Sequence, residues 1–152
     1  MGYLYVLDVW LERAVPSDQI CKAFDLHEHW QYEGFGLETN AFQKVLLEPF
    51  ETERARRKRR GKPWDLPIIE QRHRVPKNTR IMKMEPLVSN GWLLFAGGLS
   101  EEFLRQIEDF PNDRHDDGPD AVAAALSLAR GPRLTTKPGS RPRKTRGSLS
   151  QF

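Results

Sequence analysis

The residues best suited to chemistry are carboxylates crowded into one short stretch, His115-Asp116-Asp117-Gly118-Pro119-Asp120. Pro119 fits the first turn of a helix, where its missing N–H costs nothing. Asp117 and Asp120 are three residues apart, so on such a helix they share one face. Carboxylates that point into the same space repel each other unless a cation lies between them, and oxygen-rich groups suit Mg²⁺ or Mn²⁺. The stretch therefore predicts a divalent-metal site, and the alternative is that these acids only stabilise the positive end of the helix.

A second candidate acid, Glu38, ends the apolar segment Phe35-Gly36-Leu37, which has the character of a short buried strand. A carboxylate is expensive to bury unless it is paired or bound to a metal. Open α/β sheets bind their ligands beyond the ends of strands. Glu38 is therefore a candidate metal ligand, and the alternative is an ordinary glutamate at a strand end. Asp8 also ends a predicted strand, and we interpret it as facing solvent.

The third feature is a basic run from Arg54 to Lys62, in which seven of nine residues are Lys or Arg. Nucleic-acid phosphates attract such runs and release counterions when they bind. The alternative is a solvated helix end, where cations suit the negative pole of the helix dipole. The candidate DNA-binding residues of the run are Arg54, Arg56, Arg57, Lys58, Arg59, Arg60 and Lys62.

Strands and helices are predicted to alternate along the chain, which indicates an α/β domain. The predicted strands are Tyr3–Val9, Gly34–Glu38 and Leu66–Glu70, with a β-hairpin over Leu87–Phe95 that turns at Asn90-Gly91. The predicted helices are Val15–Trp30, one from near Asn40 into the basic run, Asn78–Met84, Ser100–Asp109 with Ser100 as its cap, and Asp117–Arg130.

Charge is divided unevenly over the 152 residues, which carry 24 basic and 21 acidic side chains. Six of the basic residues lie in 131–152, a segment without Asp or Glu, which leaves 18 basic against 21 acidic residues in 1–130. Residues 1–130 are thus predicted to form one domain, and the basic, Pro- and Gly-rich tail 131–152 to be disordered. No apolar run approaches membrane-spanning length. The single Cys21 excludes an intrachain disulfide and fits the reducing cytoplasm that we expect for this chain.

Four stretches taken together resemble the C-terminal nuclease domain of phage and prophage terminase large subunits. They are Tyr5-Val6-Leu7-Asp8 with Glu12-Arg13; Gly36-Leu37-Glu38-Thr39-Asn40-Ala41-Phe42-Gln43; Lys77, Arg80-Ile81, Glu85-Pro86-Leu87 and Gly91-Trp92-Leu93-Leu94-Phe95; and Phe110-Pro111 followed by the His115–Ala121 stretch. The resemblance spans about Tyr3 to Leu128.

The resemblance implies an RNase H-like fold of the RuvC and integrase type, a mixed sheet flanked by helices, and cleavage of double-stranded concatemeric DNA with two Mg²⁺ or Mn²⁺ ions. Glu38 corresponds to the acid of the family's central strand, and Asp117 and Asp120 to its helix-borne acids. Asp116 is also a candidate because neighbouring positions are hard to register, and Lys77 lies near the site as a DNA contact. The implied partners are double-stranded DNA, the terminase ATPase domain, the small terminase subunit and the portal, in the cytoplasm of a bacterial host and not at a membrane.

Two departures from the family pattern divide the functional hypotheses. The family's first strand carries a metal-bridging Asp just before the segment that matches Tyr5, and no counterpart occurs in this sequence. The Gly-x-x-x-x-Gly-Lys-Ser/Thr motif of an ATPase is also missing. The first hypothesis is a metal-dependent endonuclease domain that needs the missing strand for efficient cleavage. The second is an inactive, truncated prophage remnant that only binds DNA.

Overall fold

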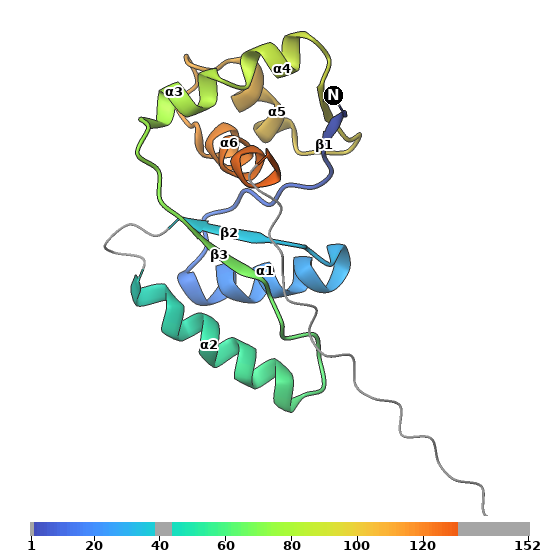
Figure 1. Cartoon of the computed structure of the whole chain (residues 1–152), viewed down its shortest axis with the longest axis vertical. Coiled ribbons are helices and arrows are strands. Elements are labelled where there is room, and N and C mark those ends of the chain that lie inside the picture. The colour runs from blue at the N-terminus through green and yellow to red at the C-terminus, as the bar shows by residue number, and fades with distance from the viewer. Residues whose placement is uncertain (1, 39–43, 131–152) are drawn as a thin grey trace, which may run out of the picture.

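The computed structural model describes residues 2–38 and 44–130, which form an α/β structure as predicted (Figure 1). In chain order its elements are β1 (Leu4–Val6), α1 (Pro16–Trp30), β2 (Phe35–Glu38), α2 (Lys44–Arg59), β3 (Ile68–Gln71), α3 (Lys77–Met82), α4 (Glu85–Ser89), β4 (Leu93–Phe95), α5 (Glu101–Glu108) and α6 (Asp117–Arg130). No helix in the described ranges is both long and apolar enough to cross a membrane.

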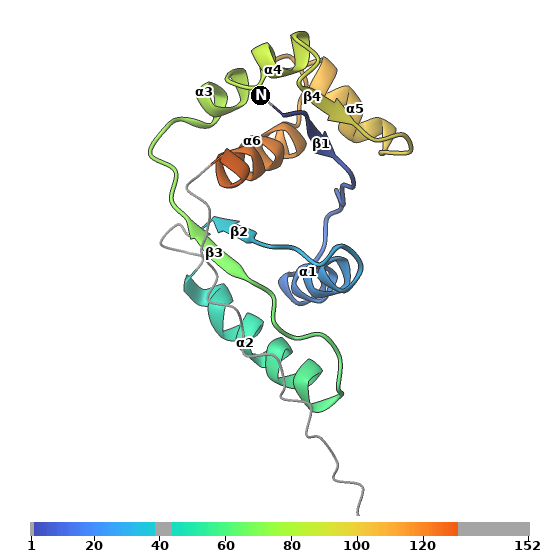
Figure 2. The ribbon, with the colours of Figure 1, turned by 45° about the vertical axis from the view of Figure 1, so that its right-hand side comes forward.

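In the described residues the strands form two separate parallel pairs, β1 with β4 and β2 with β3. The resemblance implied a single mixed sheet. Helix α6 lies between the two pairs (Figure 2). It packs on one side against the core of the β1–β4 half and on the other side against β2. Because a helix fills the space between them, the two pairs do not share backbone hydrogen bonds.

The half that contains β1, β4 and α3 to α6 has its own apolar core. Phe103 of α5 is fully buried at its centre, next to Val122 and Ala123 of α6. Ile81 of α3 and Leu87 of α4 close the core from the opposite side. These contacts place α3 directly against α6, which matters for the acidic stretch at the start of α6.

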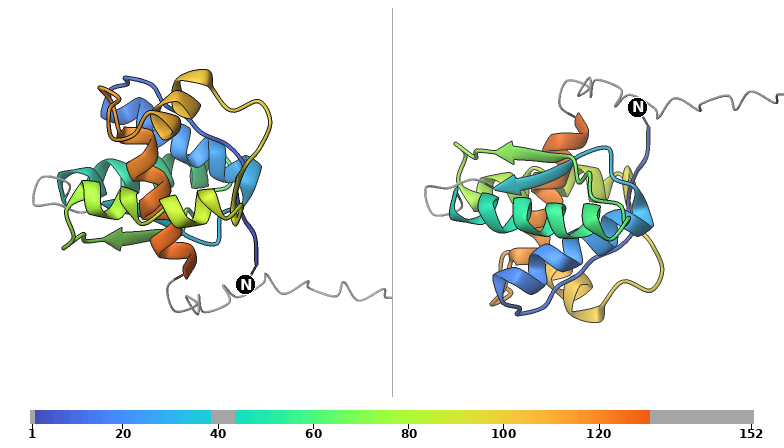
Figure 3. Two further views of the ribbon diagram at one scale, coloured as in Figure 1. Left: turned by 90° about the horizontal axis from the view of Figure 1, so that it is seen from above. Right: turned by 90° about the horizontal axis from the view of Figure 1, so that it is seen from below.

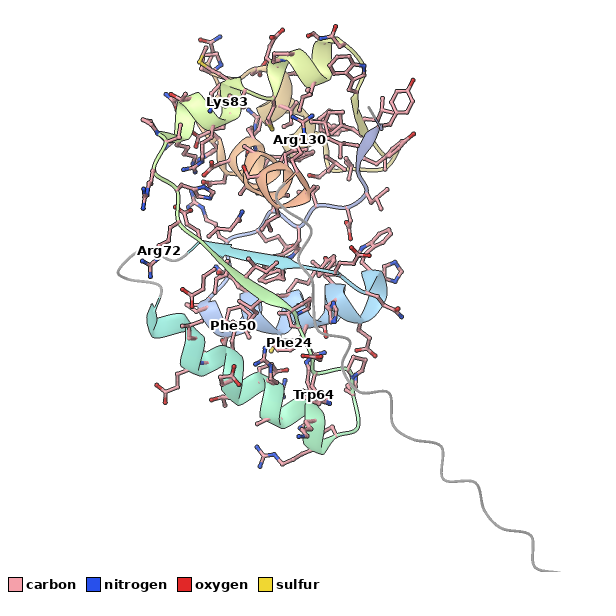
Figure 4. All side chains as sticks on the ribbon, viewed as in Figure 1. Phe24, Phe50, Trp64, Arg72, Lys83 and Arg130 are labelled. Carbon is pink, nitrogen blue, oxygen red and sulfur yellow. The ribbon has the colours of Figure 1, made fainter. Side chains whose placement is uncertain are left out.

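The other half packs α1 and α2 against one face of the β2–β3 pair, as the view from below shows (Figure 3). Phe24 of α1 and Phe50 of α2 meet in this core with ring centroids 6.3 Å apart (Figure 4). Leu66, just before β3, is also buried there. Phe35 and Leu37 of β2 pack against this same cluster.

Helix α6 touches the opposite face of β2 at a glycine. A Cβ placed on Gly36 would lie 2.6 Å from Leu128 Cδ1 and 2.5 Å from Gln71 Oε1, so glycine lets these two side chains pack directly over the strand. The Gln71 side chain donates a hydrogen bond of 3.1 Å to the Ala124 carbonyl. These two contacts fix α6 across the β2–β3 pair.

The predicted hairpin over Leu87–Phe95 is wrong. Residues Glu85–Ser89 form α4, and β4 pairs in parallel with the distant β1. Gly91 does have positive φ, +67°, but it ends a helix: Trp92 N–H donates to Leu87 O and Gly91 N–H to Val88 O, the two bonds of a Schellman motif. The Asn-Gly pair thus predicts the left-handed backbone at Gly91 correctly. That conformation ends helix α4, in which Leu87 is buried, and does not form a hairpin turn.

The other predictions of elements hold with shifted bounds. Helix α6 has the predicted bounds, and the Ser100 hydroxyl caps α5 by accepting from Phe103 N–H at 3.3 Å. The first strand is shorter than the predicted Tyr3–Val9 because it pairs with β4 only over Leu4–Val6. Beyond it, the Asp8 carboxylate accepts from Val9 N–H and from Trp30 Nε1. The predicted helix start near Asn40 and the tail 131–152 fall outside the described residues.

Candidate functional site

The acidic stretch lies at the start of α6, where α5 holds the backbone in place. Gly118 N–H donates to the side chain of the buried Gln106 at 3.0 Å, and a Cβ on Gly118 would meet the Phe103 ring at 2.8 Å. Asp120 N–H closes the first turn on Asp116 O at 3.0 Å. The first turn of α6 is therefore fixed by packing, and its carboxylates project from a rigid base.

Two cations of α3 face these carboxylates. Lys77 Nζ lies 2.7 Å from Asp116 Oδ1, 3.3 Å from Asp117 Oδ1 and 3.9 Å from Asp120 Oδ2. Arg80 Nη2 lies 2.5 Å from Asp120 Oδ1. Lys77 and Arg80 are three residues apart, so one face of α3 presents both to α6. The acids predicted to converge on a cation thus converge on an ammonium group of the chain itself.

Exposure and charge decide how firmly this cluster is held. The side chains of Lys77 and Asp116 are each 36% exposed and that of Asp117 is 74% exposed, whereas Arg80 and Asp120 are largely buried. Burial disfavours the charged form of Lys77, but the hydrogen bonds that its ammonium donates to Asp116 and Asp117 outweigh burial and raise the Lys77 pKa. Lys77 is therefore charged at neutral pH, while solvent reaches the outer side of its ion pairs.

Glu38 lies on the side of β2 that faces α6. Alternate residues of a strand point to opposite faces, and Phe35 and Leu37 pack toward α1 and α2 while Gly36 contacts α6. Glu38 shares the face of Gly36. Its register partner Gln71 reaches Ala124, one turn along α6 from Asp120. Glu38 and the acids at the start of α6 thus come from two elements in contact, and Glu38 lies on the face of β2 that is turned toward α6.

The donors suit a hard divalent ion, but their present arrangement does not form a site for one. Carboxylate oxygens are the ligands that Mg²⁺ and Mn²⁺ prefer. Yet within residues 2–38 and 44–130 no group of three or more His, Cys, Asp or Glu side chains is arranged to hold a metal ion. Lys77 and Arg80 compensate the charge of the α6 carboxylates in this arrangement.

The basic run divides into two parts, and the first part is paired with acids. Arg57 is buried, with its guanidinium 2.6 Å from Asp25, 2.7 Å from Glu53 and 3.7 Å from Glu28. Arg56 pairs with Glu53 at 2.6 Å from the solvent side. Arg54 pairs with Glu51 and donates to the Leu66 carbonyl at 3.1 Å. These three arginines join α2 to α1 and to the segment before β3.

The second part of the run is exposed to solvent. It comprises Lys58, Arg59, Arg60 and Lys62, and Lys58 Nζ lies 4.7 Å over the centre of the Trp64 ring. Of the predicted DNA-binding residues, the structure thus presents these four openly. It buries Arg57, and it engages Lys77 with the acids of α6.

Sequence reasoning missed three residues that build the acidic site. Arg80 was assigned no role, although its spacing from Lys77 is a usable signal for a shared helix face. Gln106 and Gln71, which fix the start and the middle of α6, carry no such signal because their partners are distant in sequence.

Comparisons of this chain with protein-family models, with curated proteins and with solved structures found no match.

Proposed function

We propose that residues 1–130 form a nuclease domain like that of phage terminase large subunits, with an RNase H-like ancestry and a divalent-metal site for DNA phosphodiester hydrolysis. The observation that carries the proposal is the placement of Glu38 and the α6 acids on neighbouring elements, although nearly eighty residues separate them in sequence. The alternative is that these acids only stabilise the start of α6. That role does not require a glutamate at the end of β2 on the face turned toward α6.

In the proposed site Glu38, Asp117 and Asp120 hold Mg²⁺ or Mn²⁺, with Asp116 as a further ligand. The Lys77 ammonium now lies among the oxygens of Asp116 and Asp117. A divalent ion at the same oxygens must therefore displace it. The displacement is inexpensive because half-exposed ion pairs of lysine contribute only about 0–1 kcal/mol.

The test is the melting temperature of the chain with and without Mn²⁺, because an ion that binds only the folded state stabilises it. We expect Lys77→Met to enlarge the Mn²⁺-dependent rise, and the double variant Lys77→Met with Asp117→Asn to reduce it again. Lys83→Met is the matched control, because Lys83 is an exposed lysine that follows α3 directly. A rise that is equal in all variants, or that never occurs, contradicts a metal site at these acids.

Cleavage is tested with supercoiled plasmid in Mn²⁺, with wild type and Lys77→Met compared. Nicking that Glu38→Gln abolishes supports the nuclease, and nicking that survives Glu38→Gln contradicts the assignment of this residue.

One observation favours the second candidate function, a chain that binds DNA without cutting it. The α6 acids are already paired with Lys77 and Arg80, while four cations at the end of α2 are exposed. Binding of DNA with no nicking in any variant, and with no Mn²⁺-dependent rise in melting temperature, supports this candidate over the nuclease.

A further inference from the structure

The basic run at the end of α2 contains two kinds of cation that the sequence does not separate. Arg54, Arg56 and Arg57 form ion pairs with Glu51, Glu53 and Asp25, respectively. Each of these arginines already has a carboxylate at 2.5–2.6 Å. A phosphate that bound them would have to break an existing ion pair, so these three residues are poor anchors for a nucleic acid.

The remaining four cations, Lys58, Arg59, Arg60 and Lys62, differ from these three arginines. No carboxylate of residues 2–38 or 44–130 lies within ion-pair distance of them. All four side chains are exposed, and the stretch from 58 to 64 contains no acidic residue. We call Lys58, Arg59, Arg60 and Lys62 the α2 end.

The backbone fixes the α2 end into one compact shape. Lys62 N–H donates to Arg57 O and Gly61 N–H to Lys58 O, which are the two bonds of a Schellman motif. Gly61 takes φ +65°, a left-handed conformation that glycine adopts at little cost. The motif folds Lys62 back against the last turn of α2. Like charges are therefore held close together, and an extended anion would relieve their repulsion.

The α2 end is also anchored from beneath. Arg57, whose carbonyl accepts from Lys62, has its guanidinium buried among Asp25, Glu28 and Glu53. The paired half of the run thus acts as a rigid support, and the unpaired half is presented on it. A surface that is ordered before binding loses less entropy on binding.

The chemistry of this surface suits a phosphodiester backbone. Several exposed cations within two helical turns match the regularly repeated charge of a nucleic acid, whereas a single small anion is usually held by buried donors. An anionic membrane surface is a poorer match, because a membrane-binding helix needs an apolar face next to its cations. The apolar side of α2 is used internally, with Phe50 buried against Phe24.

We propose that the α2 end is a sequence-independent binding surface for the nucleic-acid backbone, and that Arg54, Arg56 and Arg57 support it without touching the ligand. The inference rests on the proposed function only in taking DNA as the natural partner. It concerns contacts that position a duplex, and such contacts do not read its sequence.

The experiment measures binding of a fluorescent DNA duplex by anisotropy over a series of salt concentrations, in EDTA so that cleavage plays no part. The full chain is used with the six tail cations changed to Gln, so that the α2 end is measured by itself: Arg133, Lys137, Arg141, Arg143, Lys144 and Arg146. In this background the test variant is Arg59→Ala, Arg60→Ala and Lys62→Ala. The control, Arg13→Ala, Lys83→Ala and Arg114→Ala, removes three exposed cations elsewhere. Lys83 and Trp64 lie at opposite ends of the molecule (Figure 4).

We expect the test variant to lose on the order of tenfold or more in affinity and to lower the salt slope by about one per cation removed, for every duplex sequence alike. The control should retain most of the affinity. Both variants should melt near the parent temperature, since substitutions of exposed side chains usually change stability little. Equal losses in test and control would overturn the proposal, as would tight binding to phosphatidylserine vesicles with none to DNA. Because metal and cleavage are absent, this result is independent of the nuclease test.

Discussion

Two clusters in this molecule share one plan, a central cation with three carboxylates around it and a second arginine on one of them, yet the central cations differ in depth. Arg57 meets Asp25, Glu28 and Glu53 between α1 and α2 with 7% of its side chain exposed. Lys77 meets Asp116, Asp117 and Asp120 between α3 and α6 with 36% exposed. In the first cluster Arg57 and Glu53 are shielded from water although Asp25 and Glu28 are exposed, whereas in the second cluster water reaches Lys77 itself.

The choice of cation follows the same division. The planar guanidinium of Arg57 reaches two carboxylates at once from fixed directions, and it also lies 5.2 Å from the centre of the Phe24 ring. The Lys77 ammonium is a compact charge on a flexible stem. A buried arginine suits permanent structure, and a half-exposed lysine suits an ion pair that another cation can replace.

The largest expected effect is on the buried cluster. Arg57→Met leaves Glu53 buried with less compensation, and breaking a buried pair in this way costs about 3 kcal/mol. Chemical denaturation should report the loss as a lower midpoint. Arg56→Met is the control, because Arg56 pairs with the same Glu53 from solvent and should shift the midpoint far less. Equal shifts would mean that the two arginines are energetically equivalent and that depth does not matter.

A second substitution tests whether α6 couples the halves that carry the two clusters. Gly36→Ala brings a Cβ to within 2.6 Å of Leu128 Cδ1 and 2.5 Å of Gln71 Oε1, so the ends of these two side chains must move, and we expect a cost near the low end of the about 1–3 kcal/mol typical of overpacking. Gly97→Ala is the control, since nothing lies within 4 Å of a Cβ there. Thermal melting should show a clear drop for Gly36→Ala alone, and an unchanged melting temperature would indicate that α6 is not in contact with β2.

Acid should weaken the buried cluster through Glu53. Hydrogen bonding to Arg56, opposed by burial and reinforced by Arg57, lowers the Glu53 pKa below its ordinary value of 4.5. Its stabilising contribution is therefore complete above pH 4.5 and is lost as the pH falls through the lowered pKa. Denaturation curves from pH 6 to pH 3 should show this loss in wild type. Glu53→Gln should be less stable at pH 6 and less dependent on pH, and a wild-type slope retained in Glu53→Gln would assign the effect to another acid.

The smallest effect belongs to Lys77. Without divalent ions, Lys77→Met should change the free energy of unfolding by about 0.5 kcal/mol or less, because its ion pairs are solvated. Adding 1 M NaCl should reduce this difference in unfolding free energy between wild type and Lys77→Met, because salt screens exposed ion pairs. Urea denaturation of both proteins at two salt concentrations checks this. A loss near that of Arg57→Met would show that the exposed cluster is structural after all.

The sequence by itself determined the local elements, because their signals lie within a few residues. Pro119 and the apolar repeat after it predicted α6 with its observed bounds, and Ser100 predicted its own cap. The same local logic failed at Asn90-Gly91. A left-handed glycine serves both a hairpin turn and a helix end, and Gly61 and Gly91 each end a helix here.

Only the tertiary structure decided which charges face each other. The run from Arg54 to Lys62 is uniformly basic in sequence, and ion pairs of its first three arginines, with burial of Arg57 against α1, divide it into supporting and presented residues. The acids of α6 are identifiable from the sequence as a cluster, but their pairing with Lys77 and Arg80 depends on how α3 packs on α6. Electrostatic interactions act through space and depend on exposure to water, and neither distance nor exposure is encoded in the order of residues alone.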